Sequence, residues 1–161
     1  MEKRINISKT APQAYKAMLG LESYLAQSEI SKTIKELIKI RASQINGCAY
    51  CLDMHTKDAI KYGETAERIF LVSAWHEADK FFTEEEKVAL KMTEEITLIS
   101  QNGLSDDTYQ KAKSVFSEKQ IAEIIMAIVI INSWNRIALS TRLEIGRSEE
   151  HTSELQSPDH L

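Results

Sequence analysis

Residues 32–55 read KTIKELIKIRASQINGCAYCLDMH, and this stretch decides the fold. Its first part repeats apolar side chains at the three- and four-residue spacing of one helix face, namely Ile34, Leu37, Ile38 and Ile45. Asn46-Gly47 is a favoured helix exit, and Gly63 marks the end of the next periodic segment. We therefore expect one helix over residues 32–45 and another over residues 48–62, separated only by a turn.

The helical period continues through most of the first 146 residues. The whole chain has only 5 glycines and 2 prolines, whereas architectures of strands and turns depend on both residue types. Capping boxes, in which Ser or Thr is followed three residues later by Glu or Gln, occur at Thr10/Gln13, Thr83/Glu86 and Ser117/Gln120. Further helices are expected over residues 11–27, 65–79, 84–100, 105–116 and 118–140. The sequence predicts an all-α domain of about six or seven helices.

Residues 124–131 form the longest unbroken apolar run. A run of this length is also compatible with a buried strand, because periodicity does not separate the two structures. The capping box at Ser117 and the continuation through Trp134 to Ala138 favour a helix. A membrane-spanning helix needs about 20 apolar residues, so no membrane crossing is expected.

Composition and charge narrow the class of protein. The chain has 161 residues, of which 43% are hydrophobic and 27% are charged, and this composition excludes disorder of the whole chain. With 20 Lys and Arg against 24 Asp and Glu, the formal net charge is −4, so a nucleic acid is not an expected partner. Residues 1–6 lack the apolar run of a secretory signal, and we expect a cytoplasmic protein.

The end of the chain differs in composition from the rest. Residues 147–161 contain Leu as their only large apolar residue type and show no helical or strand period. Residues 147–158 also resemble the translation of a common sequencing adapter. We therefore place the domain in residues 1–146 and expect residues 147–161 to be a disordered polar tail of artefactual origin. Without this tail, 19 basic residues face 20 acidic ones, so the charge of the domain is −1.

Cys48, Cys51 and His55 carry the chemical signal of the opening stretch. At positions i, i+3 and i+7 of a helix they lie on one face. Cys48 is expected in the first turn, where unpaired backbone N–H groups and the helix dipole favour a thiolate. Cβ atoms three residues apart in a helix are separated by about 5–6 Å, and a disulfide needs about 3.5–4.5 Å. A modest distortion of the first turn therefore allows a reversible disulfide.

The identity of the attacking thiol depends on which of two effects dominates. The helix dipole favours Cys48, which lies nearer the helix start. Distance to the base favours Cys51, because His55 lies about 6 Å along the helix axis from Cys51 and about 10 Å from Cys48. We take Cys51 as the nucleophile and Cys48 as the resolving thiol, with His55 as the group that deprotonates Cys51 or pairs with it.

Two interpretations without thiol catalysis stay open at this point. Cys-x-x-Cys with a nearby His can bind zinc, with Glu36 as a fourth ligand, although the sequence has no second Cys-x-x-Cys. Alternatively, both cysteines are buried apolar residues and His55 is a hydrogen-bonded core histidine.

The run from Glu36 to His55 closely resembles the core motif of the alkylhydroperoxidase AhpD-like, carboxymuconolactone decarboxylase family. Weaker matches are Trp75, the helix start at residues 82–86 and the segment 132–136, so the resemblance covers roughly residues 5–142. It implies an all-α fold that assembles into homo-oligomers, commonly trimers or hexamers, with the dithiol in a mostly buried pocket. In peroxidase members of that family the second cysteine attacks the peroxide and the first resolves it, which corresponds to Cys51 and Cys48.

The resemblance also implies that Glu36 and His55 relay protons to and from the attacking thiol. One departure from the family is Tyr50, because the best-studied peroxidase members have a histidine there. A phenol is a hydrogen-bond donor and a poor base at neutral pH, so we expect Tyr50 to orient a peroxide or a water and to shape the pocket together with the neighbourhood of Trp75. The decarboxylase branch typically lacks the paired cysteines, which argues against lactone decarboxylation.

Together these features predict a thiol-dependent peroxidase, or a related thiol-disulfide oxidoreductase, with an antioxidant role. Its expected partners are a small hydroperoxide substrate and an external dithiol reductant, and no metal or organic cofactor is expected. The alternative is a non-catalytic or slow redox-sensing oligomeric module of the same family. A metal-binding protein is a further alternative.

Overall fold

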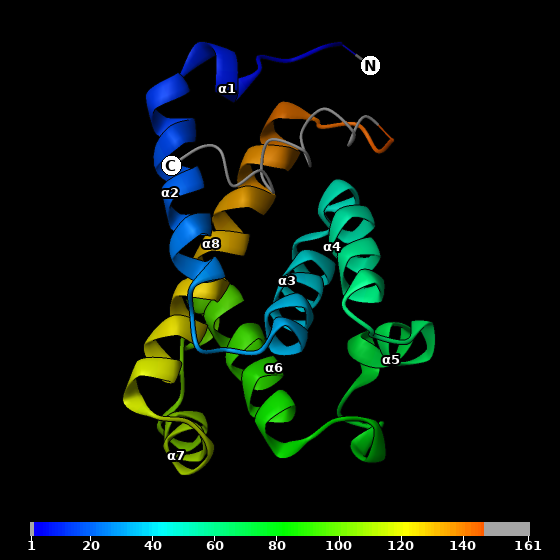
Figure 1. The fold of residues 1–161 in the computed structure, drawn as a ribbon, viewed down its shortest axis with the longest axis vertical. Coiled ribbons are helices and arrows are strands. Elements are labelled where there is room, and N and C mark those ends of the chain that lie inside the picture. The colour runs from blue at the N-terminus through cyan, green and yellow to red at the C-terminus, as the bar shows by residue number, and fades with distance from the viewer. Residues whose placement is uncertain (1, 147–161) are drawn as a thin grey trace.

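The opening stretch folds as two consecutive helices in the computed structural model, which describes residues 2–146 (Figure 1). Helix α3 covers Lys32–Asn46, and helix α4 covers Ala49–Lys61. Ser31 begins α3, because its side-chain oxygen accepts a hydrogen bond from the backbone N–H of Ile34. Gly47 ends α3 in the left-handed region at φ 69°, which a residue without a Cβ atom adopts at little cost.

The other described residues add six α-helices and three short 3-10 turns, and no strand occurs among them. The helices are α1 (Ile7–Thr10), α2 (Pro12–Ala26), α5 (Ala66–Leu71), α6 (Glu84–Thr97), α7 (Asp106–Val115) and α8 (Glu118–Thr141). The predicted all-α class is therefore confirmed, and the short α1 is the helix that the sequence pattern did not indicate. The predicted polar tail, residues 147–161, lies outside the described residues.

Two of the three predicted capping boxes are confirmed. Those at the starts of α6 and α8 contain both of their reciprocal hydrogen bonds. The box predicted at Thr10 and Gln13 is wrong, because Thr10 ends α1 and the next helix begins at Pro12 without a side-chain cap. The fixed φ of proline and its missing N–H suit the first position of a helix, so the start at Pro12 has one fewer donor to satisfy.

The helix predicted over residues 65–79 is shorter than expected. Helix α5 ends at Leu71, and the chain continues as a 3-10 turn over Val72–Ala74. Side chains three residues apart eclipse one another in such a turn, so Val72 and Trp75 both point into the core, where both are buried. The change from α-helix to 3-10 turn after Leu71 therefore coincides with the burial of these two side chains.

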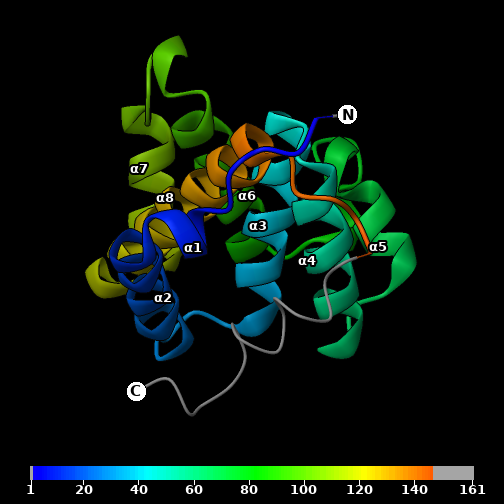
Figure 2. The same cartoon turned by 90° about the horizontal axis from the view of Figure 1, so that it is seen from above.

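The main core lies between α3, α6 and α8. From one side of the molecule to the other, α2, α8, α3 and α4 follow one another, and α6 contacts both α3 and α8 (Figures 1 and 2). In α8 the side chains of Ile124, Ile128 and Ile131 are at most 2% exposed. The helical interpretation of residues 118–140 is confirmed, and the strand alternative is wrong.

By length and composition alone, α8 is apolar enough to cross a membrane. Half of its most apolar window is buried inside the described protein. The same helix carries the buried polar residues Glu123 and Asn135, which bond to the backbone of Glu29 and to the Ser43 side chain, respectively. These contacts are those of the core helix of a folded domain.

Candidate functional site

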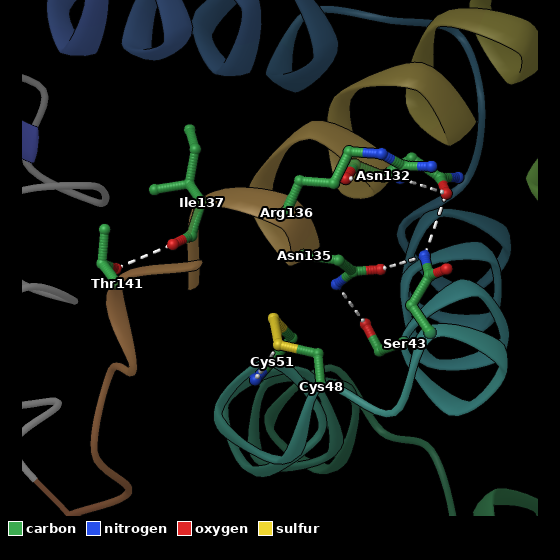
Figure 3. Close-up of a disulfide and its surroundings, with 9 residues drawn as sticks. Ser43, Cys48, Cys51, Asn132, Asn135, Arg136, Ile137 and Thr141 are labelled. Atoms are coloured by element: carbon green, nitrogen blue, oxygen red, sulfur yellow. Dashed lines mark hydrogen bonds between the residues drawn. A yellow bond between two sulfur atoms is a disulfide. The ribbon is translucent and has the colours of Figure 1, made fainter. Parts of the chain in front are cut away.

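Cys48 and Cys51 are joined by a disulfide at the start of α4 (Figure 3). Their Cα atoms lie 5.3 Å apart, and the two residues are only 1% and 3% exposed. Tyr50, Ala138 of α8 and Leu143 pack against the pair. The two sulfur atoms are thus close enough to bond, as the spacing predicts, and they are enclosed by the end of α8.

Cys48 occupies the N-cap position of α4, one residue before the first turn in which the sequence pattern placed it. Its backbone is extended (φ −88°, ψ 92°), and its Sγ accepts a hydrogen bond from the backbone N–H of Cys51 at 3.3 Å. A sulfur atom in this position faces the partial positive charge of the helix N-terminus. The electrostatic preference for a thiolate at Cys48 therefore remains, and the choice of Cys51 as nucleophile depends on His55.

Glu36 of α3 and His55 of α4 meet between the two helices. His55 Nδ1 lies 3.2 Å from Glu36 Oε2, and the two side chains are 12% and 6% exposed. We assign the ring proton to Nδ1, because a carboxylate accepts it there, and this leaves Nε2 as the basic nitrogen. His55 follows Cys51 by four residues, and helical side chains lean toward the preceding turn. The imidazole therefore lies on the helix face that carries Cys51.

Lys39 is a third charged residue in this cluster. Its Nζ lies 3.1 Å from Glu36 Oε1, so the two carboxylate oxygens bind different partners. Burial raises the pKa of Glu36, but the hydrogen bond from His55 and the charge of Lys39 outweigh it and hold that pKa below its ordinary value. Burial lowers the pKa of Lys39, but the negative charges of Glu36 and Glu22 outweigh it and raise that pKa overall. Glu36 and Lys39 are therefore both ionised at neutral pH.

Glu36, His55 and Asp58 are the one group in the described chain whose donor atoms lie close enough to share a metal ion, within 4.8 Å of one another. Neither cysteine belongs to this group, so it differs from the zinc set considered from the sequence. Lys39 lies 3.1 Å from Glu36, and Lys61 lies 3.6 Å from Asp58. Because these ammonium groups already balance both carboxylates, the cluster fits a network of ion pairs better than a cation site.

Tyr50 lies beside the disulfide, as expected. Burial, followed by the charge of Asp53, raises the pKa of its phenol above the ordinary value. The phenol therefore stays protonated at neutral pH, where it can donate a hydrogen bond but is no base. Trp75, which we expected near the pocket, instead packs in a separate cluster, and its indole N–H donates to Glu94 at 2.8 Å.

A network of amide side chains connects the cysteine turn to α8 (Figure 3). Asn46 directly precedes Gly47, and its side-chain nitrogen donates to the Oδ1 atoms of Asn132 and Asn135, at 2.9 Å each. Asn135 is fully buried and donates in turn to Ser43 Oγ at 3.0 Å. These bonds hold the turn between α3 and α4 against α8. Residues 132–136 are part of the family resemblance. An amide side chain is uncharged, however, so nothing in the sequence predicts that these residues hold the turn between α3 and α4.

A shallow groove of about 310 Å³ lies between α6 and α8, away from the predicted site residues. It is lined by both apolar and polar residues, namely Ile96, Thr97, Ile99, Val129, Asn132, Ser133 and Arg136. Neither cysteine, nor Glu36, His55 or Tyr50, contributes to it. The candidate site therefore lies outside this groove, at the buried disulfide and the residues packed against it.

Comparisons with known proteins show which family and which chains this sequence is similar to. The family model described as "Carboxymuconolactone decarboxylase family" matches residues 12–95, a range that includes both cysteines, Glu36 and His55. The uncharacterized protein YdfG of Bacillus subtilis strain 168 is 46% identical over 140 residues, which are 87% of this chain and 95% of that protein.

Several solved structures share the fold, and two of them are described next. One, from Agrobacterium tumefaciens, is described as a protein of unknown function and "Putative Antioxidant Defence Protein AhpD". It superposes with a TM-score of 0.84 at 40% identity and covers 89% of this chain and 97% of its own. The debrominase Bmp8 superposes with a TM-score of 0.74 at 22% identity and covers 89% of this chain and 77% of its own.

Proposed function

Because this chain belongs to the carboxymuconolactone decarboxylase family, we propose that its Cys48–Cys51 pair reduces small hydroperoxides. The observation that carries this function is a buried cysteine pair at the N-terminus of a helix, followed one turn later by His55 in hydrogen-bond contact with Glu36. The description of the Agrobacterium relative supports an antioxidant role. The activity is that of a thiol-dependent peroxidase, a kind of thiol-disulfide oxidoreductase.

The reaction proceeds in two steps from the reduced protein. The thiolate of Cys51 attacks the O–O bond of a hydroperoxide ROOH, becomes a sulfenic acid, and releases an alkoxide that leaves as ROH after it gains a proton. The thiol of Cys48 then attacks the sulfenic sulfur, and water leaves as the disulfide forms. The peroxide gains two electrons in this sequence, and the two cysteines lose them.

His55 and Glu36 move the protons. Nε2 of His55 accepts the proton of the Cys51 thiol and then donates it to the departing alkoxide. The proton on Nδ1 stays there and remains hydrogen-bonded to Glu36. The negative charge of Glu36 stabilises the imidazolium that forms in between. Tyr50 supplies a neutral O–H donor that orients the peroxide.

The cycle closes when an external dithiol reduces the disulfide and is itself oxidised to a disulfide. None of these steps requires a metal or an organic cofactor. A cytoplasmic location supplies such thiol reductants, and we propose it for this protein. We also propose a homo-oligomer, a trimer or a hexamer, as the family resemblance implies.

Stopped-flow measurement of peroxide consumption by the reduced protein tests this function. Cys51→Ser should abolish the reaction, because serine forms no sulfenic acid. Cys48→Ser is the matched control: it should consume one equivalent of peroxide and stop at a sulfenic acid that dimedone traps. Unchanged consumption in Cys51→Ser would refute the assignment, and trapping of a sulfenic acid on Cys48 would exchange the roles of the two cysteines.

A slow redox sensor is the second candidate function. It is favoured by the burial of both cysteines, which are at most 3% exposed in the single chain and so have restricted access to peroxide. A sensor thiol should react no faster than a small thiol of matched pKa, whereas general acid and base assistance should make the peroxidase at least about 100-fold faster. The ratio of these two second-order rate constants therefore separates the candidates.

A further inference from the structure

We propose that Lys39 is a positioning residue of the thiol site, which holds Glu36 as the oriented carboxylate on which His55 depends when it accepts the proton of Cys51. The proposal rests on the proposed function of Glu36 and His55, and it assigns Lys39 a task in the reaction that goes beyond stabilising the helix pair. Lys39 acts through Glu36 and is not itself a group that touches the peroxide.

The geometry of Glu36 gives Lys39 this task. The Lys39 ammonium lies 3.1 Å from Oε1, and the His55 ring lies 3.2 Å from Oε2. Rotation of the carboxyl group would therefore break one of these two contacts. Lysine side chains are seldom buried unless they are paired, and the Lys39 side chain is only 13% exposed. The structure thus places a mostly buried cation on the oxygen of Glu36 that His55 does not use.

The charges around this pair come from four helices. Helix α2 contributes Glu22, which also accepts the indole N–H of Trp134 at 2.9 Å. Helix α3 contributes Lys35, in addition to Glu36 and Lys39 themselves. Helix α4 contributes His55 and Asp58. Helix α8 contributes Glu123, whose charge acts on Lys35. Lys39 therefore lies among several carboxylates. Its removal would leave Glu36 near the negative charge of Asp58 without its own ammonium partner.

Glu36 stays ionised where a thiol titrates, but without the Lys39 ammonium its carboxyl group is no longer held in place and can turn away from His55. The imidazolium would then be less well stabilised, so Cys51 would keep its own proton up to a higher pH. A neighbouring opposite charge shifts a carboxyl pKa by about 1–3 units. We therefore expect the midpoint of Cys51 thiolate formation to rise by about one pH unit when Lys39 loses its charge.

A thiolate titration by ultraviolet absorbance measures this midpoint directly. The protein used is the full chain with Cys48→Ser, so that Cys51 is the one thiol present. Lys39→Met and Lys39→Gln should both raise the midpoint, and Lys39→Arg should restore it. Lys35→Met is the matched control, because it removes a lysine one turn earlier on α3 whose Nζ donates to the Leu25 carbonyl instead of to Glu36. It should move the midpoint much less.

A double-mutant comparison separates action through Glu36 from a direct effect on the sulfur. In a Glu36→Gln background, Lys39→Met should cause no further shift. An equal shift in both backgrounds would overturn the proposal, and so would an unchanged midpoint in Lys39→Met or Lys39→Gln protein that circular dichroism shows to be folded. If Lys39→Met does not fold, Lys39→Gln, which keeps a hydrogen-bond donor, carries the test. No peroxide enters the titration, so its result is independent of the peroxide assay on Cys51→Ser.

Discussion

Two polar networks lie beside the helix pair that carries the cysteines, and they differ in charge. Between α3 and α4, Glu36 binds Lys39 at 3.1 Å and His55 at 3.2 Å. Between α3 and α8, Asn46 binds Asn135 at 2.9 Å, and Asn135 binds onward to Ser43. Both networks are largely buried and hydrogen-bonded, so burial alone does not distinguish them.

The difference lies in what each network can do. The ionic network changes its charge when a proton arrives or leaves, and it can therefore take part in thiol chemistry. Amides and hydroxyls do not titrate in the physiological range, so the amide network can hold the cysteine turn in place but cannot exchange protons with it. Changes to the ionic network should therefore alter reactivity and its pH dependence, and changes to the amide network should alter stability.

The largest expected effect is that of His55→Ala on peroxide reduction. Loss of the base should slow the reaction by about 100-fold or more, which corresponds to about 2.7 kcal/mol of activation free energy. Glu36 loses its hydrogen bond with His55 but keeps Lys39 as its partner in this variant, so the protein should still fold, with a lower melting temperature than the wild type. Stopped-flow kinetics and a thermal melt on the same sample measure both quantities. A large loss of stability with near-normal kinetics would mean that His55 supports the fold and does not act as the base.

Most of the helices, and the disulfide at a helix start with His55 and Glu36 close by, could be predicted because their signals are local. Glu36, Cys48, Cys51 and His55 are marked by their spacing, and Gly47 marks the turn between their helices. The contacts of Lys39 and Asn135 could not be predicted, because they depend on how α3 packs against α4 and α8. The predicted position of Trp75 near the pocket was wrong for the same kind of reason, because its indole N–H donates to Glu94 of α6.

The next largest effect is that of Asn135→Ala on stability. This fully buried residue accepts from Asn46 and donates to Ser43, so its truncation leaves polar atoms unsatisfied and a small cavity. The expected loss is about 2 kcal/mol, which lowers the melting temperature by about 4–8 °C in a domain of this size. Val129→Ala, at an exposed position of α8, is the matched control and should change stability by less than about 0.5 kcal/mol. A shift of the Cys51 thiolate midpoint as large as that of Lys39→Met would contradict the division between the networks.

The smallest expected effect is the pH dependence that Glu36 gives to folding. Its pKa is held below the ordinary value of 4.5, so its ionised form stabilises the folded protein above that pH. This contribution is lost as the pH falls through the lowered pKa of the folded state. The melting temperatures of the wild type and of Glu36→Gln should therefore differ by a constant amount near neutral pH and converge under acid. A gap that widens under acid would mean that folding raises the pKa of Glu36.

The same acid series applied to Asn135→Ala completes the comparison of the two networks. Because no group in the amide network gains a proton between neutral and acidic pH, the gap between wild type and Asn135→Ala should stay constant where the Glu36→Gln gap changes. Parallel behaviour of the two variants would mean that both networks respond to a shared transition, such as separation of α3 from its neighbours. Divergent behaviour would assign the proton dependence of stability to Glu36 and leave the amide network without one.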